Sequence, residues 1–352
     1  MRMKKRLCST LIDRQCDRRP AWMMRQAGRY LPEYRKVRAQ AGSFLDLCYA
    51  PKLAEEVTLQ PLRRFEFDAA IVFADILLVP HALGQDVSFR EGEGPVLDPV
   101  SSDTDIHALT CERLNSHLAP VYETLDRLSS SLPGEVALIG FCGAPWTVAT
   151  YMIEGGTSRD RKTARLAAWA ALHDREHWFS KLIDLLVKSS AKYLLGQIKA
   201  GAEVLQIFET WALDLPPALF QRFCVEPIAE IVRQVKANHP EVPIICFPRG
   251  MSQSAEVFCK AVGCEGYGCD ATASLDSFEP EATRSFVTQG NLDPICLLQG
   301  GSGLDLEVQK IVRQTKPGHH IFNLGHGIVP ETPIEHVDQM LASLRAAERD
   351  EG

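Results

Sequence analysis

Arginine side chains gather in one short stretch near the start of the chain. Residues 24–38, MRQAGRYLPEYRKVR, hold four of them within fourteen positions: Arg25, Arg29, Arg35 and Arg38. Guanidinium groups are planar and bind carboxylates through two parallel hydrogen bonds. Arg25 and Arg29 are four residues apart, so one helical turn would place both on the same face, and Gly28 would leave the backbone open to a close ligand. The stretch therefore predicts a site for a molecule that carries carboxylates.

The alternative is a solvated basic segment in which Arg35 and Arg38 pair with Glu33 or with other surface acids. The position of the stretch favours a site, because it follows a short apolar run, residues 20–24, that is typical of a strand. Polar groups just beyond a strand commonly line binding sites.

More polar residues follow apolar runs elsewhere in the chain: Asp75, Tyr151, Thr210, Arg249, Asp270, Asn291 and His326. Each has an ordinary alternative when taken alone. Asp75 suits a helix cap and Asn291 a turn, while His326 suits a surface position and Tyr151 the core. Taken together, and each after a different run, they indicate one shared site.

The apolar runs alternate with helical patterns along the chain. The predicted strands are residues 20–24, 68–74, 136–141, 204–208, 244–247, 266–268, 285–289 and 320–324, and the predicted helices are 50–65, 111–131, 161–200, 217–238, 253–262 and 332–347. Eight strands alternating with helices are the signature of parallel βα units. The pattern predicts a single (β/α)8 barrel with its site at the C-terminal mouth of the strands.

A doubly wound open sheet is the alternative fold, and it would need a glycine-rich phosphate turn after the first strand. The sequence has none there. Residues 266–271 fit G-x-G-x-x-A, but they come late in the chain and no helical pattern follows directly. We therefore expect no dinucleotide cofactor.

Composition places further bounds on the protein. With 352 residues, 45% hydrophobic and 24% charged, the chain is typical of a globular protein, and we expect a loose basic N-terminal extension over 1–18 and a barrel domain over 19–352. No apolar run reaches the roughly 18 residues of a membrane span, and the basic start lacks the apolar core of a secretory signal. These features predict a cytoplasmic protein.

Net charge and cysteine content bear on the partners of the protein and on the state of its thiols. A net charge of −7 argues against nucleic acid or an anionic membrane as the main partner. The eleven cysteines are scattered without C-x-x-C pairs, and many lie in apolar runs, so we expect reduced, buried thiols.

The sequence MRQAGRYLPEYR at 24–35 resembles the N-terminal signature of the uroporphyrinogen decarboxylase family, whose members convert the four acetate side chains of uroporphyrinogen to methyl groups and so form coproporphyrinogen. The resemblance continues, in the family's order and over nearly the whole chain, at residues 58–65, 73–77, 143–147, 151–156, 290–294 and 323–327.

This resemblance implies a (β/α)8 barrel, usually homodimeric, that binds a tetrapyrrole and uses neither metal nor organic cofactor. It also implies a cleft lined by Arg25, Arg29, Arg38, Asp75, Tyr151, Thr210 and His326. The chain departs from the family pattern in three places. Thr210 stands where serine is usual, Ala212-Leu213-Asp214 replaces an Ala-Gly pair, and Ala271 stands where tryptophan is common. These departures bear on how the substrate fits.

Losing CO2 from an acetate requires a place for two electrons, which most enzymes supply with a cofactor. Here the pyrrole ring of the substrate can serve if the ring carbon next to the acetate is protonated. The protein must then bind carboxylates, stabilise a transient cation and move protons. The identity of the proton donor stays open, since arginine is a poor acid with a reference pKa above about 12.

The residues divide among these roles. The arginines Arg25, Arg29 and Arg38 would hold carboxylates, and Asp75 would accept hydrogen bonds from pyrrole N–H groups and balance the ring cation. Tyr151, Thr210 and His326 would orient carboxylates or relay protons. The expected catalytic set is Asp75, Arg25, Tyr151 and His326.

Two other functions remain as alternatives. A zinc-dependent methyltransferase of a related barrel would need an H-x-C motif and a later cysteine, but no H-x-C occurs, and Cys259, Cys264 and Cys269 lie in apolar or turn sequence. A non-catalytic tetrapyrrole carrier would use the arginines but would have no use for a carboxylate facing a polyanion. Asp75 discriminates between the enzyme and the carrier.

Overall fold

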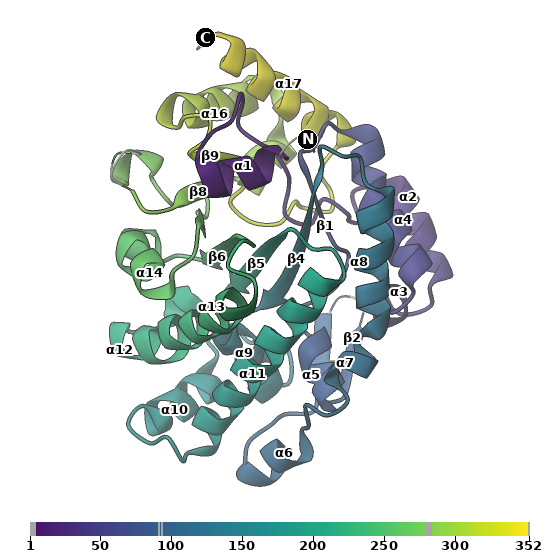
Figure 1. The fold of residues 1–352 in the computed structure, drawn as a ribbon. Helices are drawn as coiled ribbons and strands as arrows, with labels where there is room; N and C mark the ends of the chain where they lie inside the picture. The colour runs from purple at the N-terminus through teal and green to yellow at the C-terminus, as the bar shows by residue number, and fades with distance from the viewer. Residues whose placement is uncertain (1–4, 91, 93, 279, 281–283, 351–352) are drawn as a thin grey trace.

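A computed structural model describes residues 5–90, 92, 94–278, 280 and 284–350. Seven strands form one sheet in which every neighbouring pair is parallel (Figure 1). In spatial order they are β1 Ala69–Ile71, β4 Ala137–Gly143, β5 Val204–Glu209, β6 Ile244–Pro248, β7 Gly266–Gly268, β8 Val287–Leu292 and β9 His320–Leu324. Nearly all of their residues are buried. All seven coincide with or overlap the predicted runs.

The predicted first strand, residues 20–24, closes the circle between β9 and β1. On one side Trp22 N donates to Phe322 O (3.2 Å) and Phe322 N donates to Pro20 O (2.9 Å); on the other side Asp68 N donates to Ala21 O (2.8 Å). The segment is reduced to a single bridge at Ala21, because Pro20 has no N–H and the Ala21 N–H is taken by the Asp68 side chain (2.9 Å). With this eighth segment the sheet forms a (β/α)8 barrel.

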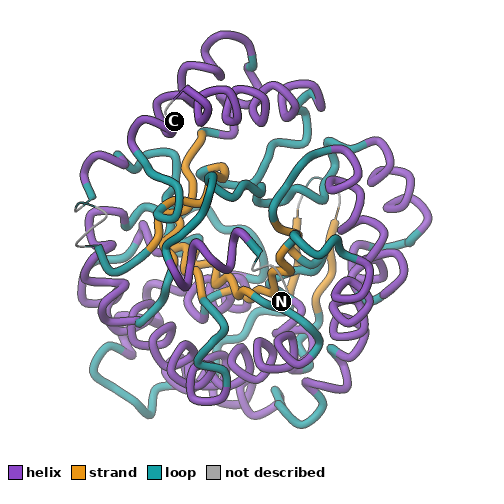
Figure 2. Tube along the Cα trace, turned by 45° about the horizontal axis from the view of Figure 1, so that its top comes forward, coloured by secondary structure: helices purple, strands orange, loops and turns teal. Residues whose placement is uncertain are grey.

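Helices surround the strands (Figures 1 and 2). The longer ones are α4 Pro51–Arg64, α8 Ala119–Ser131, α9 Pro145–Glu154, α10 Lys162–Ala171, α11 Trp178–Lys199, α13 Glu226–Asn238, α16 Gly301–Gln314 and α17 Ile334–Asp350. The shorter ones are α1 Arg6–Asp13, α2 Pro32–Gln40, α3 Phe44–Cys48, α5 Leu78–Leu83, α6 Asp103–Ala108, α7 Leu114–His117, α12 Pro217–Phe220, α14 Ala255–Val262 and α15 Pro294–Gln299. No helix among the described residues is both long enough and apolar enough to cross a membrane.

Irregular turns interrupt some of the predicted helices. Residues 217–238 contain a π-helical turn, η2 Gln221–Val225, between α12 and α13. Pro227 lies in the first turn of α13 and has no N–H to give to the preceding turn, which explains the wider local winding. The predicted region 161–200 divides into α10 and α11. Short 3-10 turns complete the chain at η1 Ala212–Asp214, η3 Ser252–Ser254 and η4 Leu275–Ser277.

A β-hairpin that the sequence did not predict lies between α5 and α6. Its strands are β2 Val87–Arg90 and β3 Gly94–Leu97, paired antiparallel. Val96 bridges to Gly156, and Leu97 N donates to Gly155 O (3.0 Å). The hairpin therefore packs against the loop that follows α9.

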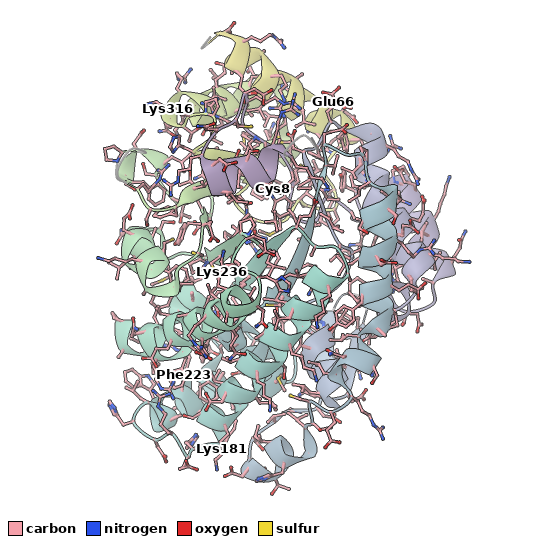
Figure 3. All side chains as sticks on the ribbon, in the orientation of Figure 1. Cys8, Glu66, Lys181, Phe223, Lys236 and Lys316 are labelled. Atoms are coloured by element: carbon pink, nitrogen blue, oxygen red, sulfur yellow. The ribbon has the colours of Figure 1, made fainter. Side chains whose placement is uncertain are left out.

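The N-terminal segment differs from the expected loose extension, because α1 packs across the N-terminal end of the barrel. Leu7 and Leu11 are buried, and Cys8, labelled in Figure 3, packs against the core. Lys5 Nζ donates to Glu203 (2.6 Å), directly before β5. A Cβ on Gly266, the first residue of β7, would contact the Leu11 side chain. Buried leucines one helical turn apart hold the segment in place.

Asp68, directly before β1, is a charged centre at this same end. Its carboxylate is 4% exposed and accepts hydrogen bonds from three guanidinium groups, those of Arg6 (3.3 Å), Arg18 (3.3 Å) and Arg345 (3.2 Å). It also accepts from Ala21 N (2.9 Å). One buried carboxylate thereby ties α1, the closing segment, β1 and α17 together.

Candidate active site

The opposite end of the barrel carries the polar residues singled out in the sequence. All strands of the sheet are parallel, so their carboxyl ends meet at one edge. Each of these residues follows or ends its strand: Arg25 after the closing segment, Asp75 after β1, Tyr151 in α9 after β4, Thr210 after β5, Arg249 after β6, Asp270 after β7, Asn291 in β8 and His326 after β9. The topology therefore brings them to the same mouth.

The helical turn predicted for Arg25 and Arg29 is not formed. Residues 24–31 make turns and bends, and α2 begins only at Pro32. A proline disfavours the helical conformation of the residue before it, and Leu31 is extended. Gly28 lies too close to the carbonyl oxygen of Arg25 for a side chain, with 2.8 Å from that oxygen to a Cβ placed there. Gly28 thus permits a tight turn.

Arg25 has an unusual backbone conformation, with φ at 64° in the left-handed region. Non-glycine residues rarely adopt this conformation, and it is found preferentially at functional sites. Its side chain lies against the adjacent loop after β9, where a Cβ on Gly327 would collide with it. The conformation therefore places the guanidinium beside His326.

The arginines of this stretch differ in their partners. Glu33 pairs with Arg64 (2.9 Å from Nη2 to Oε2), and Arg35 donates to the Arg29 carbonyl oxygen (2.6 Å). Within the described part of the chain, no ion pair to a carboxylate is formed by Arg25, Arg29 or Arg38. Arg38 Nη1 donates instead to the Gly42 carbonyl oxygen (2.8 Å). Glu33 is therefore not the partner of Arg35 or Arg38.

Asp75 is half-buried, and its pKa is raised by burial, an effect that the nearby Arg25 opposes. Its Oδ1 atom accepts a hydrogen bond from Leu77 N (2.8 Å), so it does hold the turn before α5. Its second oxygen has no hydrogen-bond partner among the described residues. One oxygen therefore fixes the carboxylate, and the other can meet a ligand.

Tyr151 and His326 share this electrostatic environment. Burial and the Asp75 carboxylate raise the pKa of Tyr151, so the phenol keeps its proton at neutral pH. Burial, then Arg25 and Arg249, lower the pKa of His326 to about 4, so its imidazole is neutral at pH 7. Both side chains interact electrostatically with Arg25, which makes that guanidinium the link between them.

Other predicted residues lie at the edges of this group. Burial raises the pKa of the Tyr34 phenol in α2, and Arg38 and Arg29 oppose this rise. Burial and, to a smaller extent, Asp75 raise the pKa of the Cys48 thiol, and Arg38 opposes this rise. Thr210 is half-buried between Glu209 and Trp211. Asn291 donates its amide to the carbonyl oxygens of Asp270 (3.2 Å) and Ala273 (2.8 Å), so it braces the loop after β7.

Sequence reasoning missed Glu209, a fully buried carboxyl at the end of β5. Burial raises its pKa to about 8. The Thr147 hydroxyl donates to Oε1, and Thr147 N lies 3.4 Å from Oε2. The only signal in the sequence was an acid that ends an apolar run. Glu209 joins the end of β5, directly before Thr210, to Thr147 in α9, the helix that carries Tyr151.

The described residues hold no group of three or more histidine, cysteine or acidic side chains arranged for a metal ion. Of the three cysteines considered in the sequence, Cys259 and Cys264 lie close together with Cys246 in the core. The Cys269 thiol donates to the Tyr267 carbonyl oxygen (3.8 Å).

Comparison with known proteins adds a second line of argument. Residues 2–347 match the profile of the family described as Uroporphyrinogen decarboxylase (URO-D). The chain is 54% identical over 330 residues to the uroporphyrinogen decarboxylase of Mesorhizobium japonicum, with 94% of each chain covered. It is 50% identical over 327 residues to that of Rhodospirillum rubrum, with 93% of each covered. A methyltransferase from Methanosarcina mazei has the same fold, with a TM-score of 0.78, 17% identity and 98% and 97% coverage.

Proposed function

The chain belongs to the uroporphyrinogen decarboxylase family, and we propose that it removes CO2 from the four acetate side chains of uroporphyrinogen to give coproporphyrinogen. The observation that carries this proposal is the charge pattern of the barrel mouth. Arg25 and Arg29 have no carboxylate partner among the described residues. They lie at the same mouth as Asp75, whose carboxylate has one oxygen without a hydrogen bond in the described structure.

This combination suits a polyanion that also carries N–H groups. The guanidinium groups attract carboxylates, whereas a carboxylate in the same pocket repels them. Asp75 is favourable only where it meets hydrogen-bond donors or a positive charge, and the pyrrole N–H groups of a tetrapyrrole supply the donors. The cation formed during decarboxylation supplies the positive charge.

The chemistry balances without an external electron acceptor. A proton adds to the pyrrole carbon next to the acetate, and the ring becomes a cation. The bond between the acetate methylene and its carboxylate then breaks, CO2 leaves, and the bond electrons enter the ring. Protonation of the exocyclic methylene and loss of the ring proton leave a methyl group. Each round consumes one proton and releases one CO2.

The residues of the mouth serve these steps in different ways. Asp75 stabilises the ring cation, and this interaction is strongest when the charge has formed. The guanidinium groups of Arg25, Arg29 and Arg38 hold carboxylates. Further members, Tyr151, Thr210 and His326, orient them through a phenol, a hydroxyl and a neutral imidazole. Asp75, Arg25, Tyr151 and His326 form the catalytic group.

We also propose that the protein works as a cytoplasmic homodimer without metal or organic cofactor, because the family resemblance implies each of these properties. Light scattering coupled to gel filtration should give a mass twice that of one chain. A mass of one chain at working concentration would contradict the dimer but would leave the chemistry unaffected.

The activity is tested by incubating purified protein with uroporphyrinogen under anaerobic conditions and separating products by carboxylate number. We expect successive loss of the four acetate carboxylates, unchanged by a metal chelator. If a chelator abolished turnover and zinc restored it, the proposed metal-free reaction would be overturned. Tight binding without any loss of carboxylate would instead identify a carrier.

A further inference from the structure

A single buried hydroxyl, that of Thr147, joins the segments of the barrel mouth that follow β4 and β5. Thr147 lies in the first turn of α9, and its side chain is fully buried. The hydroxyl donates to Oε1 of Glu209 and accepts a hydrogen bond from the Trp211 N–H (3.3 Å). A threonine hydroxyl has one hydrogen to donate, and the carboxyl group takes it. One side chain thus bonds to the residues on both sides of Thr210.

Further contacts hold the same two segments together. Oε2 of Glu209 lies 3.4 Å from Thr147 N, one of the N–H groups at the start of α9 that have no partner within the helix. The Trp146 indole donates to the Trp211 carbonyl oxygen (3.2 Å), and Arg249 N donates to the Glu209 carbonyl oxygen (3.0 Å). The end of β5 is therefore fixed to α9 and to the loop after β6.

The Trp211 side chain is held as well. Cζ of Arg161 lies 4.2 Å from the centroid of its indole ring, a cation–π contact. Arg161 is 7% exposed and forms an ion pair with Asp214. Asp214 belongs to the Ala212-Leu213-Asp214 stretch, at which the chain departs from the family pattern. The residue after Thr210 is thus fixed both at its backbone and at its ring.

These contacts bear on two residues of the proposed site. Tyr151 comes four residues after Thr147 in α9, one helical turn along the same face. We propose that Thr147 and Glu209 are positioning residues that fix the Thr210 hydroxyl relative to the Tyr151 phenol. Both are fully buried, so they act through Tyr151 and Thr210 and not on substrate. The effect on turnover rests on the proposed function, because Tyr151 and Thr210 act on substrate only there.

Thr147→Val tests the hydroxyl, because valine has nearly the same shape but neither donates nor accepts a hydrogen bond. It should lower kcat/KM about tenfold, since a displacement of reacting groups by about 1 Å can cost up to about 10²-fold. Thr147→Ser keeps the hydroxyl and should recover most of the lost activity. A folded Thr147→Val protein with the parental kcat/KM would overturn the proposal.

Thr124→Val on α8 is the matched control. Thr124 is also a fully buried helical threonine, and its hydroxyl donates to the Pro120 carbonyl oxygen of the same helix (2.9 Å). This variant should leave kcat/KM unchanged. A loss as large as that of Thr147→Val would show that any buried helical hydroxyl has the same effect, and would contradict a specific role for Thr147.

The role of Glu209 is tested by Glu209→Gln, which keeps an acceptor for the Thr147 hydroxyl. It should therefore retain most of the parental kcat/KM. A loss as large as that of Thr147→Val would contradict the positioning role of Glu209.

A multiple-mutant cycle tests whether the effect passes through the two residues of the mouth. In a background with Tyr151→Phe and Thr210→Val, neither hydroxyl is left to be positioned. Thr147→Val should then cause no further loss of kcat/KM. Losses that multiply would show a merely structural role and overturn the proposal.

A measurement without turnover separates this proposal from the proposed function. The methyl group of Thr210 can be followed by NMR of protein with carbon-13 in its threonine methyl groups, with Thr210→Ser for assignment. Its order parameter should fall in Thr147→Val and return toward the parental value in Thr147→Ser. An unchanged order parameter in Thr147→Val would overturn the positioning role. An inactive parent protein that shows this change would refute only the proposed activity.

Discussion

Arginines at the two ends of the barrel differ in their partners. Those at the N-terminal end, such as Arg6 and Arg345, bind the carboxylate of Asp68. Within the described structure, Arg25 and Arg29 at the mouth form no such pair. Unpaired guanidinium groups on an acidic protein remain available for an anionic ligand.

Arg29→Ala should weaken the hold on substrate carboxylates. Charge-assisted hydrogen bonds are worth about 1.5–3 kcal/mol each, so kcat/KM should fall at least about tenfold. The melting temperature should stay that of the parent, because Arg29 is exposed. Arg63→Ala, which breaks the exposed pair with Glu56 (2.8 Å), serves as the control. Normal turnover by Arg29→Ala would show that the arginine stretch is only a surface feature.

The sequence predicts single site residues where they stand directly after an apolar run. Asp75 and His326 are polar residues that follow apolar runs, and the parallel strands bring them to one end. The ion pair between Arg161 and Asp214 was not predictable, because the two residues are far apart in sequence and meet only in the folded chain. Trp211 resembles an ordinary core aromatic residue in the sequence, and nothing in its neighbouring residues distinguishes it from one.

Among the elements, the closing segment and its neighbours depend on Asp68. Asp68→Asn would keep one acceptor oxygen but remove the charge that three guanidinium groups share. Leaving partly buried arginines without their partner should lower the free energy of unfolding by about 2–4 kcal/mol. Urea denaturation measures this change, and kcat per folded molecule should stay constant. An unchanged urea midpoint would show that α1 and α17 are held by apolar packing alone.

Glu209 joins the end of β5 to α9, and its pKa rises from 4.5 to about 8 on folding. Between these values the folded protein holds a proton that the unfolded chain has released. The free energy of unfolding therefore falls as the pH rises through this window. Glu209→Gln removes the effect, because the amide does not titrate.

Relative to Glu209→Gln, the parent should lose up to about 1.4 kcal/mol of stability per pH unit between about pH 5 and about pH 8. Urea unfolding of both proteins across this range gives the difference directly. Parallel stability curves would mean that the carboxyl is charged in the folded protein.

Elements with continuous apolar runs were predicted from the sequence, and elements that depend on contacts between distant residues were not. Seven strands lie close to their expected positions, because buried parallel strands have a strong local signature. Of the longer helices, α4, α8, α10, α11, α13 and α17 fall in predicted regions, whereas α9 and α16 had no predicted counterpart. The hairpin of β2 and β3 has short strands with a glycine and a proline, which gave no strand pattern. The helix α1 was missed because the segment 1–18 as a whole is basic, which obscured the apolar pair Leu7 and Leu11.

For the molecule as a whole, the two ends of the barrel have different tasks. The N-terminal end is closed by α1 and by a network around Asp68, which serves stability. The C-terminal mouth carries arginines without ion pairs in the described structure, a fixed carboxylate and a neutral imidazole. Parallel strands impose this separation, since every loop that follows a strand opens on the same side.

The central claim is that the mouth decarboxylates a tetrapyrrole by stabilising a ring cation with Asp75. The most direct test is kcat of Asp75→Asn with uroporphyrinogen under anaerobic conditions. Asparagine keeps an oxygen for Leu77 N, so the turn before α5 is preserved while the charge is lost. Losing one preorganised group typically costs about 3–4 kcal/mol, so kcat should fall by about 10²–10³ and kcat/KM with it. Asp75→Glu should fall less, because it keeps the charge. A folded Asp75→Asn protein with the parental kcat would contradict the account.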